Sequence, residues 1–105
     1  MKVSAWNNGD RLITGAGYGI KIPKSERDKF FDINRPDISI LLPNGERVRT
    51  KLTDSFWRKC IEIRHKNIGQ WLIGNGHKHW PKGHPSKFDL IPVEPSTFEL
   101  KETTP

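Results

Sequence analysis

The sequence predicts one mainly β domain, a small open or pseudo β-barrel with two short helices. A chain of 105 residues has material for one modest core and not for two. Several short segments have the residue pattern of strands, and only two have the spacing of helices. A barrel also leaves few exposed sheet edges, which so small a chain has little else to cover. We therefore expect a single domain over residues 1–101 and a disordered polar tail over residues 102–105.

The first third of the chain is expected to contain two strands and a helix. Glycines punctuate the first twenty residues and separate a short strand over 3–6 from an alternating strand over 18–22. A proline then stands where a helix can open, and Ser25 and Asp28 have the spacing of a capping box. These signals predict a short helix over residues 25–31.

The clearest hairpin follows, and it bears a row of basic side chains. An apolar run over 38–42 and an alternating run over 47–52 flank a Pro-Asn-Gly turn. In the second run Arg47, Arg49 and Lys51 share one face at intervals of about 7 Å, close to the phosphate spacing of a nucleic-acid strand. The row could follow such a backbone, or it could be an ordinary solvated strand face.

The second half of the chain predicts a further helix and two closing strands. Residues 54–63 have a mixed pattern that fits either a strand or a helix. Helical spacing over 67–73 ends at a Gly-Asn-Gly stop. Beyond a rigid loop over 80–85, strands are expected over 88–92 and 97–100.

The positive charge is concentrated in one part of the chain. The formal net charge is +6 and the sequence pI is about 9.7, which indicates an anionic partner. Between Arg47 and Lys87, ten basic residues stand against Asp54 and Glu62, a balance of +8, and the rest of the chain has a balance of −2. This asymmetry favours a docking surface for a polyanion over charge that merely solubilises the protein.

Composition also argues against membrane and secreted proteins. No apolar run approaches the roughly 18 residues that span a bilayer, and the N-terminus lacks the pattern of a secretory signal. A single cysteine, Cys60, cannot form an internal disulfide, which agrees with a reducing compartment. We expect a cytoplasmic protein that has no membrane contact and needs no cofactor.

The order of these segments resembles the plant-type B-three DNA-binding pseudobarrel, a fold also similar to the DNA-recognition domains of some restriction endonucleases. Residues 20–24 and the helix after them resemble the strand-then-helix opening of that family, and residues 40–51 resemble its central hairpin. Ser-Phe-Trp at 55–57 stands where the family has an aromatic-rich strand. The segments that resemble its second helix, basic turn and closing strands contain Trp71 and Leu72, Lys82 and Gly83, 88–91, and 98–100.

The resemblance implies a non-catalytic domain that grips double-stranded DNA through a basic concave face and two loop arms. One arm is expected around residues 7–18 and the other around 51–59. Arginine can pair with guanine and asparagine with adenine, while lysine and serine commonly contact phosphate. Whether a separate effector protein acts beside the domain stays open. The residues expected at the DNA are Asn7, Asn8, Arg11, Lys24, Arg47, Arg49, Lys51, Ser55, Arg58, Lys59, Arg64 and Lys66.

Two other function classes stay open. A small ribonuclease or toxin would use His77 or His79 as general acid and base beside Lys78. A basic protein-interaction module would instead meet an acidic protein with the same charged surface. A metal site built from these histidines with His84 and Cys60 is not expected, because the loop lacks a carboxylate that could orient the ligands.

The cysteine and the tryptophans also have a functional and a structural interpretation. Basic neighbours could activate Cys60 as a nucleophile, but a cysteine is more often a small buried hydrophobe. Trp57, Trp71 and Trp80 could stack on unpaired bases. Each lies within an apolar pattern, which favours packing in the core.

Overall fold

The sheet of this protein curls around its own core and stays open along one side. The computed structural model of the chain describes residues 1–9 and 13–102. Seven strands and three short helices follow one another along these residues. They are β1 (Lys2–Asn7), β2 (Tyr18–Lys21), α1 (Lys24–Phe30), β3 (Asp37–Leu41), β4 (Arg47–Lys51), α2 (Asp54–Arg58), β5 (Glu62–Arg64), α3 (Lys66–Gly74), β6 (Lys87–Glu94) and β7 (Thr97–Glu102).

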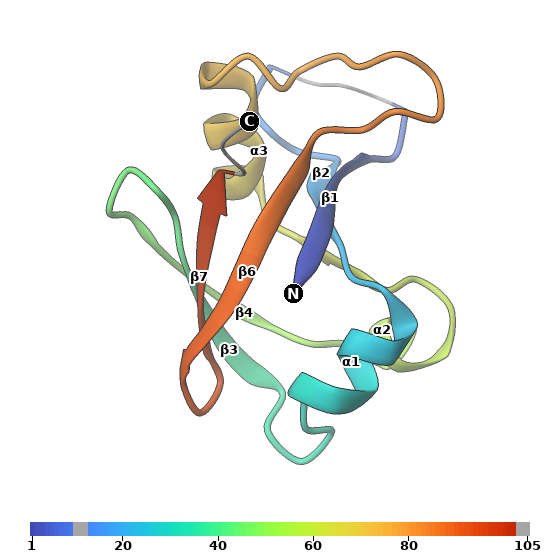
Figure 1. Cartoon of the computed structure of the whole chain (residues 1–105), viewed down its shortest axis with the longest axis vertical. Coiled ribbons are helices and arrows are strands. Elements are labelled where there is room, and N and C mark those ends of the chain that lie inside the picture. Colours follow the sequence, from blue (N-terminus) through green and yellow to red (C-terminus); the bar gives the residue numbers. More distant parts are fainter. Residues whose placement is uncertain (10–12, 103–105) are drawn as a thin grey trace.

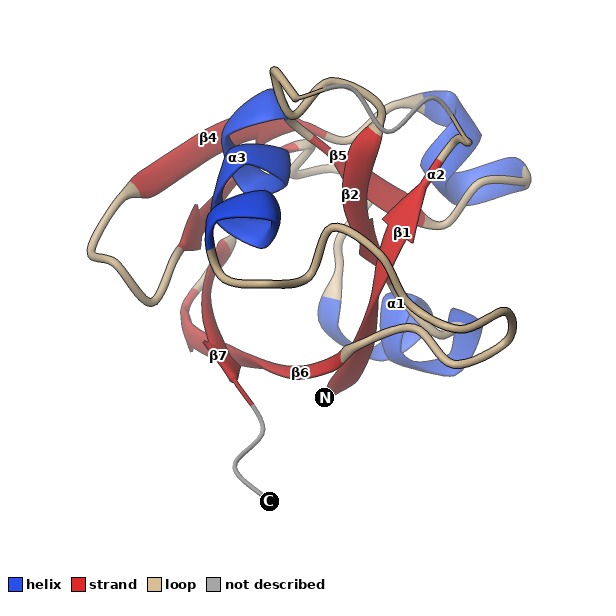
Figure 2. Ribbon diagram, turned by 90° about the horizontal axis from the view of Figure 1, so that it is seen from above, coloured by secondary structure: helices blue, strands red, loops and turns tan. Residues whose placement is uncertain are grey.

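Strand pairing leaves β4 and β5 as the two edges of one sheet. The order is β4-β3-β7-β6-β1-β2-β5, and all neighbours are antiparallel except β3 and β7, which are parallel. The sheet bends into a half-barrel (Figure 1), and the view from above looks down onto α3 with α1 at the far end (Figure 2). The predicted small open β-barrel is confirmed, with three helices in the described residues rather than two.

The core fills the inside of the half-barrel with alternate residues of its strands. In β1 and β3 the buried side chains are Val3, Ala5, Ile38 and Ile40, and the residues between them are half-buried. All six strands predicted from residue patterns are present, and β5 arises from the segment with the mixed pattern. No helix within residues 1–9 and 13–102 is long and apolar enough to cross a membrane.

Helix α1 begins two residues earlier than the predicted capping box on Ser25 requires. Its N-cap is Pro23, whose carbonyl oxygen accepts hydrogen bonds from the N–H groups of Glu26 and Arg27 at 3.0 and 2.9 Å. No side chain caps the helix, and Ser25 lies within its first turn, so the predicted capping box was wrong. The proline, with φ −61° and ψ 142°, fixes the start instead.

The aromatic-rich strand that the resemblance implied at residues 55–57 is instead the short helix α2. A strand would send Phe56 and Trp57 to opposite faces of the sheet. In a helix, neighbouring side chains diverge by only about 100°, so both can lie toward the protein. Phe56 is fully buried, Trp57 is half-buried against the core, and their rings meet edge-on at 5.4 Å.

Strand β7 continues beyond its predicted end at residue 100. Glu102 is paired with Phe88 of β6, and its carboxylate contacts the His77 ring at 2.9 Å. The residue therefore belongs to the sheet rather than to the predicted tail. Residues 103–105, the rest of that tail, lie outside the described residues.

A buried arginine joins α1 to α2. Nη1 of Arg27 donates hydrogen bonds to the carbonyl oxygens of Phe56 at 3.2 Å and Trp57 at 3.1 Å, both in the last turn of α2. Nε pairs with the Asp28 carboxylate at 2.9 Å, and the guanidinium lies 5.5 Å from the centre of the Trp57 ring. Carbonyl groups at a helix end lack partners within the helix, and a cation there also complements the helix dipole. Arg27 therefore fixes the position of α2.

Replacing Arg27 with methionine should lower the free energy of unfolding by about 2–4 kcal/mol, because two carbonyl groups lose their buried donor. Urea-induced unfolding followed by circular dichroism measures the change. Lys29→Met on the exposed side of the same helix is the matched control, with an expected change within about 0.5 kcal/mol. Equal losses in the two variants would contradict this role of Arg27.

Candidate nucleic-acid interface

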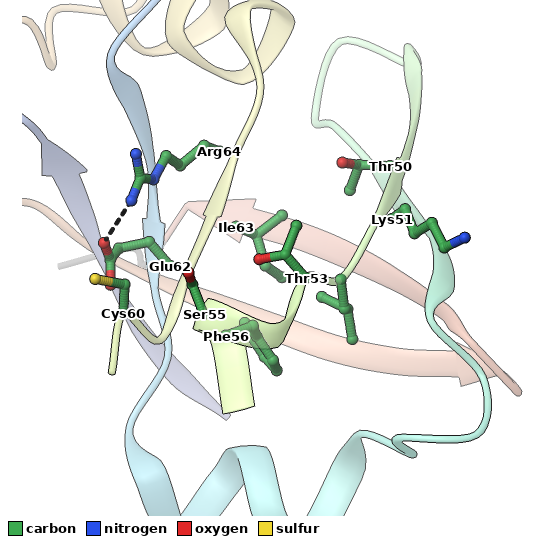
Figure 3. A pocket seen from close by; sticks show the side chains of 10 residues that line it. Thr50, Lys51, Thr53, Ser55, Phe56, Cys60, Glu62, Ile63 and Arg64 are labelled. Carbon is green, nitrogen blue, oxygen red and sulfur yellow. Dashed lines mark ion pairs between the residues drawn. The ribbon is translucent and has the colours of Figure 1, made fainter. Parts of the chain in front are cut away.

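A cleft of about 350 Å³ lies where β4 and β5 fail to pair. Figure 3 shows side chains of β4 on one side, those of β5 on the other, and α2 between them. In this view the Lys51 ammonium points away from the cleft, whereas the Glu62 and Arg64 side chains meet at its opposite wall. The lining residues are Thr50, Lys51, Leu52, Thr53, Ser55, Phe56, Cys60, Glu62, Ile63 and Arg64.

Arg64 connects this cleft to the outer face of β1 and β2. Its guanidinium lies 3.7 Å from the carboxylate of Glu62, whose side chain is only 7% exposed. It also lies 4.8 Å from the centre of the Trp6 ring. Gly19 stands between Trp6 and Arg64 in the sheet and pairs with both, so no side chain separates the cation from the indole. The ion pair and the cation–π contact hold the guanidinium in place while half of the Arg64 side chain stays exposed.

The two predicted arms lie at opposite ends of the β2–β5 pair. Arm 1, around residues 7–18, reaches the start of β2, and arm 2, around residues 51–59, ends shortly before the start of β5. The strands are antiparallel, with Lys21 at the end of β2 opposite Glu62 at the start of β5. Four residues of β2 span about 10 Å. The outer face between the arms therefore presents Lys21 and Arg64, with the largely buried Glu62 carboxylate on the same face.

Arm 1 is anchored on α3 by a close backbone contact between two glycines. A Cβ atom at Gly69 would overlap the carbonyl oxygen of Gly15, and one at Gly15 would overlap the carbonyl oxygen of Lys66. Gly15 also has a φ of +89°, which side chains disfavour. Gln70 completes the anchor, because its Nε2 donates to the Thr14 carbonyl oxygen at 3.1 Å.

The predicted base-reading residues of arm 1 have different environments. Oδ1 of Asn7 accepts a hydrogen bond from the Gly9 N–H at 2.8 Å, so a bidentate contact with adenine would have to break this bond. Asn8 is exposed, and its backbone N–H donates to the Gly17 carbonyl oxygen at 2.9 Å. Arg11, the third predicted residue of this arm, lies outside the described residues.

The other predicted residues are distributed over several surfaces. Arg47 and Arg49 are exposed on β4, Ser55 lines the cleft, and Arg58 and Lys59 are exposed on arm 2. Lys24 and Lys66 are the first residues of α1 and α3, and neither lines the cleft between β4 and β5. The predicted cations that form no ion pair with any carboxylate of residues 1–9 and 13–102 are Lys24, Arg47, Arg49, Lys51, Arg58, Lys59 and Lys66.

Trp6 and Lys21 belong to the same face but were not among the predicted residues. For Lys21 a signal existed, because it alternates with the buried Ile20 and Ile22 and must point outward. For Trp6 the sequence offered no comparable signal, since its contact with Arg64 depends on the register of three strands.

His77, one of the two histidines proposed for a nuclease, is engaged through both ring nitrogens. Nδ1 of His77 lies 2.9 Å from the Ser86 hydroxyl, and Nε2 lies 2.9 Å from the Glu102 carboxylate. These contacts tie the α3–β6 connection to β7 and occupy the atoms that would move a proton. Within residues 1–9 and 13–102, no three His, Cys, Asp or Glu side chains are grouped so that they could hold a metal ion. Cys60 is half-buried beside the cleft.

Trp57, Trp71 and Trp80, for which both core packing and base stacking were considered, differ in burial. Trp71 is 5% exposed, so its predicted place in the core is confirmed. Trp57 and Trp80 pack against the core but stay partly exposed.

Comparisons with known proteins give no relative from which a function could be transferred. No family model, no curated protein and no solved structure matches the chain. A function for this chain therefore rests on its own residues and geometry.

Gly69→Ala should destabilise the fold by about 1–3 kcal/mol, because the added Cβ forces arm 1 away from α3. Gly74→Ala on the same helix is the matched control, since a Cβ there meets open space. Its higher helix propensity should leave stability unchanged or raise it by up to about 1 kcal/mol. Thermal unfolding of both variants measures the difference, and equal melting temperatures would refute the anchor.

Proposed function

We propose that this chain is a non-catalytic DNA-binding domain of the B-three type that holds double-stranded DNA with its two arms. The observation that supports it most is the set of seven predicted cations without an ion-pair partner in the described residues. Unpaired cations repel one another and do little for the fold. Against DNA, each phosphate that they neutralise releases counterions and adds affinity.

The spacing of the arms favours a duplex as the partner. The arms attach about 10 Å apart, at the two ends of the β2–β5 pair. The major groove of B-DNA is about 12 Å wide. A groove centred on this pair therefore brings one phosphate backbone to each arm and turns Lys21 and Arg64 toward the DNA. A single strand offers only one backbone and would leave one arm unused.

Arm 2 is the better candidate for base recognition. Its helix is held by Arg27, so Ser55 and Arg58 are presented from a fixed support rather than from a free loop. A pre-positioned arginine loses less conformational entropy when it pairs with guanine. The β4 row of Arg47, Arg49 and Lys51 suits phosphate contacts, because its members repeat along an extended strand. A DNA partner and a lone cysteine also fit a cytoplasmic location.

The test is binding of the purified protein to a random duplex library, with selection and sequencing. Single-stranded DNA, RNA and heparin are assayed beside it at two salt concentrations. Enrichment of a short duplex motif supports the proposal. Heparin binding as tight as duplex binding would favour an acidic protein partner instead. No binding to DNA at low salt would refute the proposal.

Arg49→Ala and Arg58→Ala should change DNA binding in different ways. Loss of a phosphate contact at Arg49 should weaken all duplexes similarly and reduce the salt slope by about 1. Loss of a base contact at Arg58 should cost about 1–3 kcal/mol for the preferred motif and less for other sequences. Fluorescence anisotropy over a salt series measures both effects.

Lys101→Ala is the control for this pair. Lys101 is exposed on β7 and lies 3.6 Å from the Glu99 carboxylate, so it should contribute little to DNA affinity. Identical effects of Arg49→Ala and Arg58→Ala on every sequence would contradict the division between phosphate and base contacts.

A further inference from the structure

A second hollow lies beside the proposed DNA-binding face. It is a groove of about 580 Å³ between β1, β2 and the connection from α3 to β6. Figure 1 shows this connection (orange) arching beside the end of β1. The volume is within the range of sites that hold small organic ligands, about 300–1,000 Å³. Its location next to Trp6 and Lys21 makes it continuous with the face between the arms.

The residues that line the groove combine aromatic rings with positive charge. Trp6 and Trp80 come from different elements, and Lys21 and Lys87 add two ammonium groups. None of its lining residues is a carboxylate, in a chain with twelve acidic residues. A cationic ligand such as a methylated lysine would meet two like charges here. A flat ring that bears an anion meets a complementary site.

Trp80 is the ring best placed to stack on such a ligand. One face of Trp6 is already covered by the Arg64 guanidinium at 4.8 Å. Trp80 packs against the core with part of its surface open, and no ring or cation of the described residues is stacked on it. Stacking of a base on an aromatic side chain is worth about 1–3 kcal/mol.

The two lysines are arranged to meet a phosphate. Nζ of Lys87 is held at 2.9 Å by the Ser4 hydroxyl, which fixes one ammonium group at the rim. Lys21, the second lysine, is paired with Ser4 across β1 and β2, so its side chain starts on the strand next to Ser4. Asn7, which also lines the groove, still has its side-chain NH₂ as a donor, since only Oδ1 bonds to Gly9.

We propose that this groove holds one unpaired nucleotide of the DNA, with its base stacked on Trp80 and its phosphate beside Lys21 and Lys87. The inference rests on the proposed function, because the arms bring the nucleic acid to this face. A base within a duplex is covered on both sides by its neighbours. The nucleotide must therefore come from a bulge or a single-stranded end, where unstacking costs little.

The experiment measures binding of the 105-residue chain to three labelled DNAs: a paired duplex, the same duplex with one bulged adenine, and a five-nucleotide single strand. The bulged duplex should bind about tenfold tighter than the paired one, as expected for one stacked base. Tight binding of the single strand as well would identify a strand end as a second source of the nucleotide. 2-Aminopurine at the bulge should lose fluorescence when its ring stacks on the indole.

Trp80→Leu should remove the tenfold preference and leave the affinity for the paired duplex unchanged. Trp80→Phe keeps an aromatic platform and should retain most of the preference, which separates stacking from simple packing. Lys87→Gln should also reduce the preference, while Lys101→Gln, a lysine outside the groove, should not. Circular dichroism and thermal unfolding verify that each variant is folded.

Two failures are distinguishable. A protein that binds the paired duplex but shows no preference for either unpaired substrate, or whose preference survives Trp80→Leu, overturns this inference and leaves the proposed function intact. A protein that binds none of the three DNAs at low salt overturns the proposed function itself.

Discussion

The open side of the barrel depends on one buried guanidinium. Because β4 and β5 do not pair, the chain between them must cross a gap where no strand offers hydrogen bonds. Helix α2 crosses it, Phe56 fills the space beneath, and Arg27 supplies donors to the carbonyl groups that the short helix leaves unsatisfied. This contact therefore positions α2 between the two edges of the sheet, while pairing with β2 holds β5 on the other side of the cleft.

The parts of the fold that the sequence predicts are those in which neighbours along the chain decide the structure. The hairpin over β3 and β4 is one example, since its turn and alternation lie within fifteen residues. Helix α2 is the opposite case. Its residues fit a strand as well as a helix, and the choice falls to a partner about thirty residues earlier in the chain. Arg27 itself looks like an ordinary surface residue within a charged helix. The Gly15–Gly69 contact could not be predicted from the sequence either, because nothing near either glycine indicates that the other is its partner.

The candidate site was predictable to the same limited extent. Alternation on β4 is enough to show that Arg47, Arg49 and Lys51 share a face, and the structure leaves all three exposed. The alternation pattern does not show which strands border that face. Trp6 and Arg64 meet across Gly19 because β1, β2 and β5 are neighbours in the sheet, although β5 follows β2 only after forty residues. The groove beside Trp80 depends on the same strand order and on a long connection that no local pattern positions.

Stability and binding draw on different cations in this protein. Arg27 is buried, has fixed partners and is committed to the fold, whereas the cations of β4 and arm 2 are exposed and lack ion pairs in the described residues. Repulsion among the exposed group opposes folding and falls when a polyanion neutralises it. A ligand that binds only the folded chain therefore stabilises the arrangement that created its site. An extended polyanion meets many of these dispersed charges at once, while a compact acidic patch would meet few. This difference favours nucleic acid over a small acidic partner for a surface spread over β4, arm 2 and the face between the arms.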